Sequence, residues 1–141
     1  MQHPHRSSII ALDVGERRIG VALANVHARL ASPLTTLQRG DTSPADIRKL
    51  VDEHDAGAVV VGLPRGLDGQ HTAQTRAVEM FKSELDQILG IPSHWQDEAV
   101  TSKQAESELI ARGKPYKKED IDALSATYIL EDYMRDHPEV V

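Results

Sequence analysis

Length, composition and charge narrow what this chain can be. Its 141 residues favour one domain with a single core, and no apolar run approaches the roughly 20 residues needed to span a bilayer. The absence of cysteine excludes disulfides and thiolate metal sites, and fits a reducing cytoplasm. The formal net charge of −6 argues mildly against a nucleic-acid partner, although four basic residues lie within residues 112–118 and Arg17 and Arg18 form a second basic pair, whereas the acidic residues are scattered.

The two ends of the chain are predicted to lie outside the folded domain. Residues 1–7 are polar, lack the apolar stretch of a secretory signal and lead directly into a strand-like run, so we expect a loose tail there. Residues 136–141 follow the last helical pattern and are expected to form a C-terminal tail. A single domain over residues 8–135 and a cytoplasmic location follow as expectations.

Three strands are predicted at the start of the domain. An apolar run that ends before Gly15 is typical of a buried strand, and a second run begins at Ile19, so the two are expected to form a hairpin. A third run contains Pro33, which favours an edge position or a bulge. These runs span residues 8–14, 19–24 and 30–37.

Helices and strands alternate after the third run. Ser43 and Pro44 match an N-cap followed by proline at the first helical position. Residues 58–62 are apolar and mostly β-branched, as in a central parallel strand. The next helix is predicted to end near Gly90, with an apolar face at helical spacing. The predicted face consists of Ala73, Ala77, Met80, Phe81, Leu85 and Ile88.

The remaining segments complete an α/β pattern. A short strand over residues 91–96 is followed by a helix that starts with a capping box of Thr101 and Gln104 and reaches about Arg112. A last helix is expected over about 119–133. The order β-β-β-α-β-α-β-α-α predicts a mixed five-stranded sheet flanked by helices.

Asp13 is the first acid in an unusual place. It lies near the end of an otherwise apolar strand, where burying a carboxylate is costly unless it is paired or binds a cation. Ends of strands are also where α/β proteins hold their ligands. The alternative is turn chemistry, since Asp-x-Gly is a common turn sequence and Gly15 follows.

Two further acids join Asp13 as candidates. Asp122 falls on an apolar helical stripe with Ala126, Ile129 and Tyr133, although an acid in the first helical turn also complements the helix dipole. Glu98 follows the strand over 91–96 and precedes a helix, so the same dipole argument offers a structural role. From residue types alone both alternatives stay open.

Three inward acids from separate segments suit hard divalent cations such as Mg²⁺ or Mn²⁺. Two such ions close together can activate a water and stabilise the leaving oxygen of a phosphodiester. We therefore hypothesise a two-ion site held by Asp13, Glu98 and Asp122. No His-x-x-x-His spacing and no Gly-x-x-x-x-Gly-Lys phosphate loop offers a competing chemistry.

Four sequence blocks carry a resemblance to a known family. They are Leu12-Asp13-Val14-Gly15 with Arg17-Arg18-Ile19-Gly20-Val21-Ala22; Val61-Gly62-Leu63-Pro64 with Asp68-Gly69; Asp97-Glu98 with Thr101-Ser102 and Ala105; and Ile121-Asp122-Ala123 with Ile129-Leu130-Glu131. On these blocks the chain resembles the YqgF family, also called RuvX, from about Ser8 to Tyr133. Its members are described as Holliday-junction resolvases or as nucleases that mature the 5′ end of pre-16S ribosomal RNA.

The resemblance implies a fold, a chemistry and a site. It implies an RNase H-like fold, in which three antiparallel strands continue into parallel ones. It also implies a nuclease whose acids lie on the first strand, after a later parallel strand and on the last helix, which correspond here to Asp13, Glu98 and Asp122. The implied substrate is pre-16S rRNA or branched DNA. A symmetric junction would favour a homodimer, so monomer and homodimer both stay open.

The chain departs from the family pattern at two places. Ala99 stands where the family usually has an arginine, which in that position could pair with a phosphate. Its loss could weaken activity, change the substrate or be offset by Arg17, Arg18 or Lys103. Arg65-Gly66 replaces a Leu-Asn pair that often follows Leu-Pro in the family.

Basic residues suggest where nucleic acid would bind. The loop before the last helix is expected to grip phosphates through Lys114, Lys117 and Lys118, with Tyr116 available to stack on an unpaired base. Arg17 and Arg18 at the hairpin turn are candidates for contacts to the strand backbone. The alternative at both places is a solvated surface.

Two other functions compete with a nuclease. Asp13-x-Gly15 with Gly20 also resembles the first phosphate hairpin of actin-like ATPases, but 141 residues supply one lobe and a second phosphate hairpin is missing. A non-catalytic module that binds ribosomal RNA or a partner is favoured by Ala99 and the acidic charge. The three intact acids argue against it, because a decayed site has no reason to keep mutually repelling carboxylates.

Overall fold

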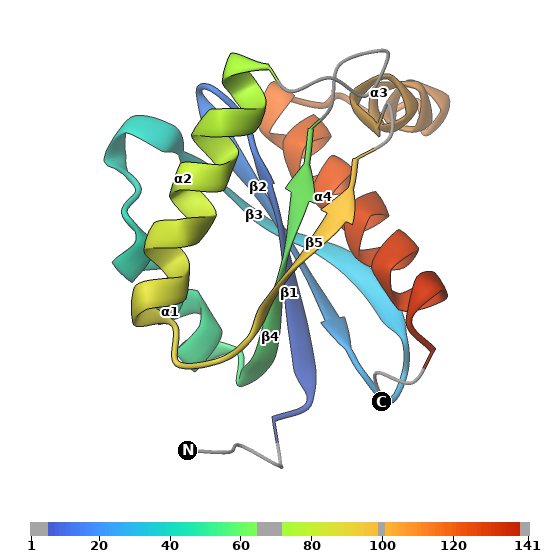
Figure 1. Cartoon of the computed structure of the whole chain (residues 1–141). Helices are drawn as coiled ribbons and strands as arrows, with labels where there is room; N and C mark the ends of the chain where they lie inside the picture. Colours follow the sequence, from blue (N-terminus) through green and yellow to red (C-terminus); the bar gives the residue numbers. More distant parts are fainter. Residues whose placement is uncertain (1–5, 65–71, 99–100, 139–141) are drawn as a thin grey trace.

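Five strands form one mixed sheet with helices on both faces (Figure 1). The computed structural model describes residues 6–64, 72–98 and 101–138. The sheet order is β3-β2-β1-β4-β5, with β1, β2 and β3 antiparallel and with β4 and β5 parallel to β1. The strands are β1 (Ser8–Val14), β2 (Arg18–Asn25), β3 (Leu30–Gln38), β4 (Ala56–Leu63) and β5 (Ser93–Asp97). The predicted fold class is confirmed.

In the described parts of the chain, the 3₁₀ turn η1 and the helix α1 connect β3 to β4, α2 connects β4 to β5, and α3 and α4 follow β5. Their bounds are η1 (Arg39–Asp41), α1 (Pro44–Glu53), α2 (Ala73–Ile88), α3 (Thr101–Ala111) and α4 (Lys118–Asp136). In the predicted helix start, the Ser43 backbone N–H donates to the Asp46 carboxylate at 2.8 Å, and Pro44 is the first helical residue. No helix within the described parts of the chain is long and apolar enough to cross a bilayer.

The N-terminal hairpin is tightly paired. The Gly15 N–H donates to the Arg18 carbonyl at 2.9 Å and closes the turn between β1 and β2. β3 lies at an edge of the sheet, and its register with β2 shifts between the pairs at Val21 and Ala22, where Pro33 is the partner of Ala22. The predicted edge position and irregularity at Pro33 are therefore confirmed, because proline cannot donate to a regular ladder.

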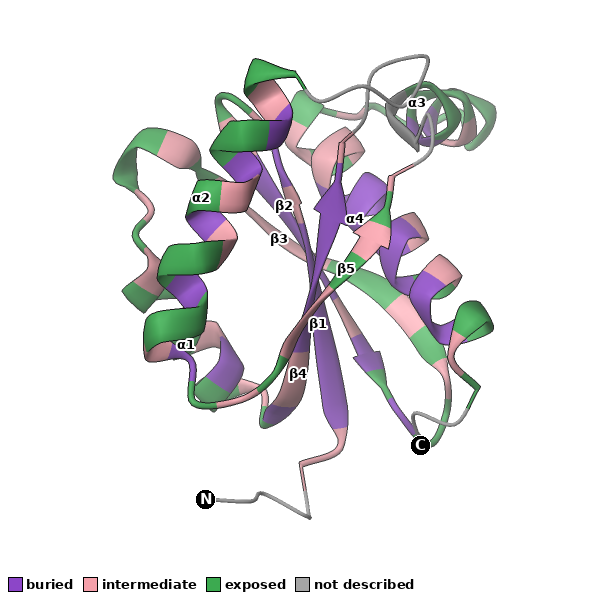
Figure 2. Ribbon diagram, viewed as in Figure 1, coloured by how far each residue is buried: buried purple, intermediate pink, exposed green. Residues whose placement is uncertain are grey.

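The face of the sheet covered by α1 and α2 carries the larger part of the core. Branched side chains of β1, β2 and β4 pack there against Ile47 and Val51 of α1 and Val78, Phe81 and Leu85 of α2. The central strands are buried along nearly their whole length (Figure 2).

The predicted apolar face of α2 was partly wrong. Met80 is 66 % exposed and Ala77 is also exposed, whereas Val78 is buried. The inward stripe runs through Thr75, Val78, Phe81 and Leu85. Met80 precedes Phe81 by one residue, which rotates it about 100° away from that stripe.

The opposite face of the sheet is built for a close helix. α4 packs its Ala126, Ile129, Leu130 and Tyr133 against a surface of mostly small residues on β1, β2 and β4. The sheet residues of this cluster are Ile9, Ala11, Ala22, Ala24 and Val60. α3 in turn packs on α4 through Ala105, Leu109 and Leu124.

The domain extends further at both ends than the sequence suggested. Arg6 donates to the Ala56 carbonyl at 2.8 Å, and the Ser7 carbonyl accepts from the Val26 N–H at 2.8 Å, so these two residues belong to the packed structure. At the other end α4 includes Asp136, and the His137 ring stacks on Tyr133 with centroids 4.2 Å apart. The sequence prediction of the tails relied on the polarity of these residues, and polarity does not reveal main-chain pairing or ring stacking.

Candidate active site

Asp13 lies between two glycines in a row across the sheet. On one side it pairs with Gly20 of β2. On the other side Leu12 pairs with Val61, which places Gly62 of β4 at the level of Asp13. Residues directly opposite in neighbouring strands point to the same face, so Asp13 faces α4 with no side chain beside it on either strand. Asp122 and Glu98 lie next to this gap in the sheet surface.

Gly20 sets the position of Asp122. A Cβ built on Gly20 would lie 2.0 Å from the Asp122 carbonyl oxygen and 2.4 Å from its carbonyl carbon. The first turns of α4 therefore rest directly on the backbone of β2. The Thr36 hydroxyl of β3 adds a second contact by donating to the Glu119 carbonyl at 2.7 Å. Together these contacts fix the start of α4 next to the strand end that carries Asp13.

Gly62 makes room for Glu98. A Cβ at Gly62 would lie 2.6 Å from Cδ1 of Ile129 and 3.4 Å from Oε2 of Glu98. The Glu98 N–H donates to the Leu63 carbonyl at 3.1 Å, which extends the pairing of β4 and β5 by one residue. That backbone contact holds Glu98 at the carboxyl end of the sheet, on the α4 face.

Asp13 and Glu98 are in direct contact. Burial raises the pKa of the Asp13 carboxyl well above its ordinary value, and the negative charge of Glu98, a hydrogen bond that protonated Asp13 donates to the Glu98 side chain and the charge of Asp122 raise it further. Two carboxyl groups share a hydrogen bond only when one of them carries a proton. The contact between the two side chains therefore favours the protonated form of Asp13.

Asp122 is engaged by an arginine. The Nε of Arg18 donates to Oδ2 of Asp122, and the two side chains are 24 % and 22 % exposed. This hydrogen bond is the main reason why the pKa of Arg18 is raised. Arg18 is two residues before Gly20 on β2 and so lies on the same face as Asp13 and α4. The structure places Arg18 on an acid of the site, whereas the sequence suggested a contact to the nucleic-acid backbone.

The three acids have the chemistry of a divalent-cation site. Carboxylate oxygens are the ligands that Mg²⁺ and Mn²⁺ prefer, and the buried contact of Asp13 with Glu98 is a place where a cation would relieve repulsion. Over the described residues, however, no three His, Asp or Glu side chains form a ready cluster of ligands. Asp122 would have to give up or share its contact with Arg18 to join the other two acids.

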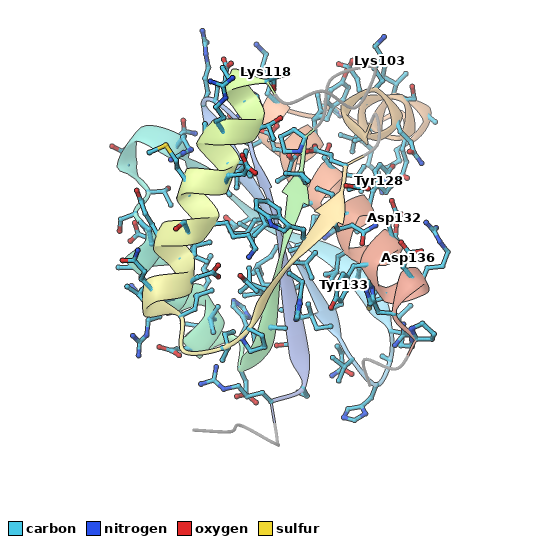
Figure 3. The ribbon with its side chains drawn as sticks, in the orientation of Figure 1. Lys103, Lys118, Tyr128, Asp132, Tyr133 and Asp136 are labelled. Carbon is cyan, nitrogen blue, oxygen red and sulfur yellow. The ribbon has the colours of Figure 1, made fainter. Side chains whose placement is uncertain are left out.

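The basic loop before α4 is exposed at its lysines. Lys114, Lys117 and Lys118 are exposed, and Figure 3 places Lys118 of α4 and Lys103 of α3 at the end of the molecule where β4 and β5 finish. Tyr116 differs from the expectation. Its ring packs against the contact between α3 and α4, and its hydroxyl donates to Glu106 at 3.1 Å, so this ring is held by the protein.

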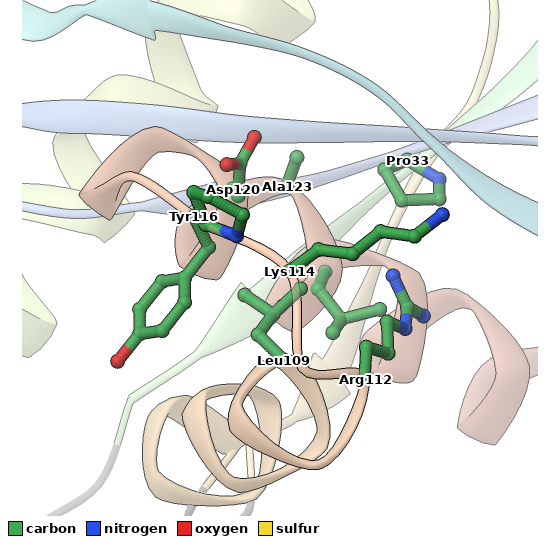
Figure 4. A pocket seen from close by; sticks show the side chains of 9 residues that line it. Pro33, Leu109, Arg112, Lys114, Tyr116, Asp120 and Ala123 are labelled. Atoms are coloured by element: carbon green, nitrogen blue, oxygen red, sulfur yellow. The ribbon is translucent and has the colours of Figure 1, made fainter.

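A hollow of about 240 Å³ lies beside this loop (Figure 4). Its walls come from β3, α3, the loop and the first turns of α4. It is lined by Pro33, Leu109, Arg112, Lys114, Pro115, Tyr116, Asp120, Ala123 and Leu124. The Lys114 and Arg112 side chains approach it together, while the Tyr116 ring points away (Figure 4). An apolar floor with a cationic rim results.

Several predicted features lie outside the described residues. These are Ala99, the Arg65-Gly66 pair and the proposed capping interaction of Thr101. Sequence reasoning missed three structural features of this candidate site, namely the two glycines beside Asp13 and the partner of Arg18. A glycine inside a β-branched run signals a close approach, and Gly62 carries that signal.

The sequence pattern of the RuvX family, described as "Holliday junction resolvase", matches residues 7–136. The chain belongs to the RuvX family. A relative from Chloroflexus aggregans is 44 % identical over 134 residues, covering 92 % of this chain and 94 % of its own length. One from Actinobacillus succinogenes is 37 % identical over 136 residues, covering 94 % and 97 %. Both carry the name "Putative pre-16S rRNA nuclease".

Solved structures support the fold of this RuvX member. Thermus thermophilus RuvC in complex with a Holliday junction substrate aligns with a TM-score of 0.59 at 18 % identity, covering 92 % of this chain and 96 % of that one. The Fowlpox virus resolvase in complex with Holliday junction DNA aligns with a TM-score of 0.57 at 7 % identity, covering 90 % and 98 %. These similarities confirm the RNase H-like fold.

Proposed function

We propose that this RuvX member is a divalent-cation-dependent nuclease that hydrolyses phosphodiester bonds of pre-16S ribosomal RNA. The observation that carries the proposal is the meeting of Asp13, Glu98 and Asp122 at one end of the sheet, with Asp13 and Glu98 in contact. Membership in the family and the names of the relatives support the reaction and the substrate. Hydrolysis breaks one P–O bond and adds water, which leaves a phosphate on one fragment and a hydroxyl on the other.

The residues have separate tasks in this proposal. Asp13 and Glu98 would hold the cation together, and its positive charge would favour the ionised form of Asp13, whose pKa is raised in its absence. Asp122 of α4 would be the third ligand, and we propose that the three acids would hold two ions. When bound, divalent cations supply positive charge that stabilises the negative charge developing on the phosphate oxygens.

The substrate strand is proposed to pass over the basic loop and the hollow beside it. Ala123 lines the hollow and follows Asp122 directly in α4. The hollow and Asp122 therefore share the first turns of the same helix, and a nucleotide seated in the hollow would lie near the acids. The apolar floor suits an unpaired base, and Lys114 at the rim suits its phosphate. Recognition of unpaired bases favours a single-stranded RNA over a fully paired junction arm.

The test compares two substrates side by side. A single-stranded RNA spanning the 5′ end of 16S rRNA and a four-way DNA junction are incubated with the protein in Mg²⁺ and in Mn²⁺, and the Asp122→Asn variant excludes a contaminating nuclease. We expect cation-dependent cutting of the RNA that the variant loses. Cutting of the junction alone would contradict the proposed RNA substrate and would show that the substrate is branched DNA. Binding without cutting of either nucleic acid would contradict a nuclease and support an assembly role.

A further inference from the structure

The contact between Arg18 and Asp122 has a consequence for how the cation site is assembled. Asp122 is bound to a side chain of opposite charge, because Arg18 donates directly to one of its carboxylate oxygens. An oxygen that accepts from a guanidinium is less available to a cation, because both compete for the same lone pairs and the same negative charge.

We propose that Arg18 is a positioning residue that holds Asp122 away from the other two acids until a divalent cation displaces it. This inference rests on the proposed function of the same site. It gives the site two states, one in which Asp122 is paired with Arg18 and Asp13 with Glu98, and one in which all three acids face the cation.

The surroundings of Arg18 favour such an exchange. Its backbone is fixed, because it begins β2, pairs with Gln38 and accepts the Gly15 N–H through its carbonyl. Its side chain is partly exposed and lies near Glu119 as well as Asp122, so it has a second acid and water as alternative partners. The backbone of Asp122 is fixed by its contact with Gly20. Only the two side chains need to move.

The exchange also bears on substrate. A guanidinium released from Asp122 stays at the edge of the site, where it suits a phosphate oxygen of the bound strand. Arg18 already lies against an acid of this site through its contact with Asp122, so it needs no backbone movement to reach such a phosphate.

The experiment measures affinity for Mn²⁺ alone by calorimetry in four proteins. They are the wild type, Arg18→Ala, Arg18→Lys and Arg17→Ala. Arg17 is the matched control because it removes the same charge from the neighbouring position, where the residue is exposed. We expect Arg18→Ala to bind Mn²⁺ about tenfold more tightly than wild type, on the scale of one charge-assisted hydrogen bond that no longer competes. Arg17→Ala should change the affinity much less, and Arg18→Lys should fall in between.

A double-mutant cycle then tests the contact itself. In an Asp122→Asn background the substitution Arg18→Ala should no longer tighten Mn²⁺ binding, because the carboxylate for which Arg18 and Mn²⁺ compete is absent. Unchanged or weaker binding in Arg18→Ala would overturn the proposal, as would equal effects of Arg17→Ala and Arg18→Ala. If Arg18→Ala fails to fold, Arg18→Lys alone decides, since it keeps the charge and loses the planar donor. Absence of Mn²⁺ binding in every protein would instead contradict the proposed function, and the exchange with it.

Discussion

The carbonyl oxygen of Asp122 lies so close to Gly20 that a Cβ on this glycine would come within 2.0 Å of it. Gly20 also pairs with Asp13 across the hairpin. One glycine therefore joins the helix that carries one acid to the strand that carries another. The site depends on this backbone contact before any side chain takes part in it.

Gly20→Ala tests this contact. The added methyl group meets backbone atoms that cannot move without shifting α4, so we expect a loss of about 2–3 kcal/mol in the free energy of unfolding. Urea denaturation monitored by circular dichroism measures it. Gly40→Ala is the matched control, because nothing lies within 4 Å of a Cβ there. Equal stability of the two variants would show that α4 does not rest on β2 as described.

Asp13→Asn should make the cation-free protein more stable. The substitution removes a half-buried carboxyl whose ionised form is repelled by Glu98 and Asp122, so above the pKa of folded Asp13 we expect a gain of about 1–2 kcal/mol in stability. The readout is the melting temperature in a chelator, with Asp132→Asn on the outer part of α4 as the control. A melting temperature below that of wild type would contradict the repulsion between the three acids.

The pH dependence of the free energy of unfolding should also report on the Asp13 carboxyl. The raised pKa of Asp13 means that the folded protein keeps a proton which the unfolded chain gives up above its ordinary value of 3.8. The folded state thus binds more protons in this range, and this contribution to stability falls as pH rises from about 4 towards the pKa of folded Asp13. Asp13→Asn should remove this slope from a series of denaturation curves in a chelator. An unchanged slope would assign it to other groups.

Lys114→Ala tests the path of the strand. Loss of one phosphate contact should weaken the binding of a single-stranded RNA about threefold and reduce the slope of log affinity against log salt by about 0.7. Fluorescence anisotropy at several salt concentrations measures both quantities. Lys49→Ala on α1 serves as the control, because α1 covers the other face of the sheet. Equal effects of both substitutions would leave the hollow without a role in binding.

How far the sequence predicts this site can be judged residue by residue. Asp13 and Asp122 were detectable because an acid inside an apolar strand or stripe is costly, and the structure brings both to one strand end. Glu98 has a weaker local signal, since an acid before a helix is ordinary, and the resemblance to the RuvX family strengthened its place beside the other two acids. Periodicity fixed most helices and strands, but it misplaced Met80 because a helix face rotates with each residue.

Other features depend on tertiary contacts that no local pattern contains. Arg18 and Asp122 are 104 residues apart, and their pairing follows from where α4 lands on β2. The position of Tyr116 also depends on tertiary contacts, because its ring packs against the contact between α3 and α4. Basic and aromatic residues in a loop predict a surface that can meet nucleic acid, but the packing decides which of them remain available.

The most direct test of the central claim is the rate at which Asp13→Asn cuts the RNA spanning the 5′ end of 16S rRNA in Mn²⁺. Asp132→Asn is the matched control, because Asp132 lies on the same helix as Asp122 and pairs with Arg135 at 2.8 Å, away from the acids. We expect Asp13→Asn to lose at least about 1000-fold in rate while remaining folded, on the scale of losing one member of a catalytic unit, and Asp132→Asn to cut like wild type. Cutting by folded Asp13→Asn at the wild-type rate would contradict a cation site built on Asp13, Glu98 and Asp122.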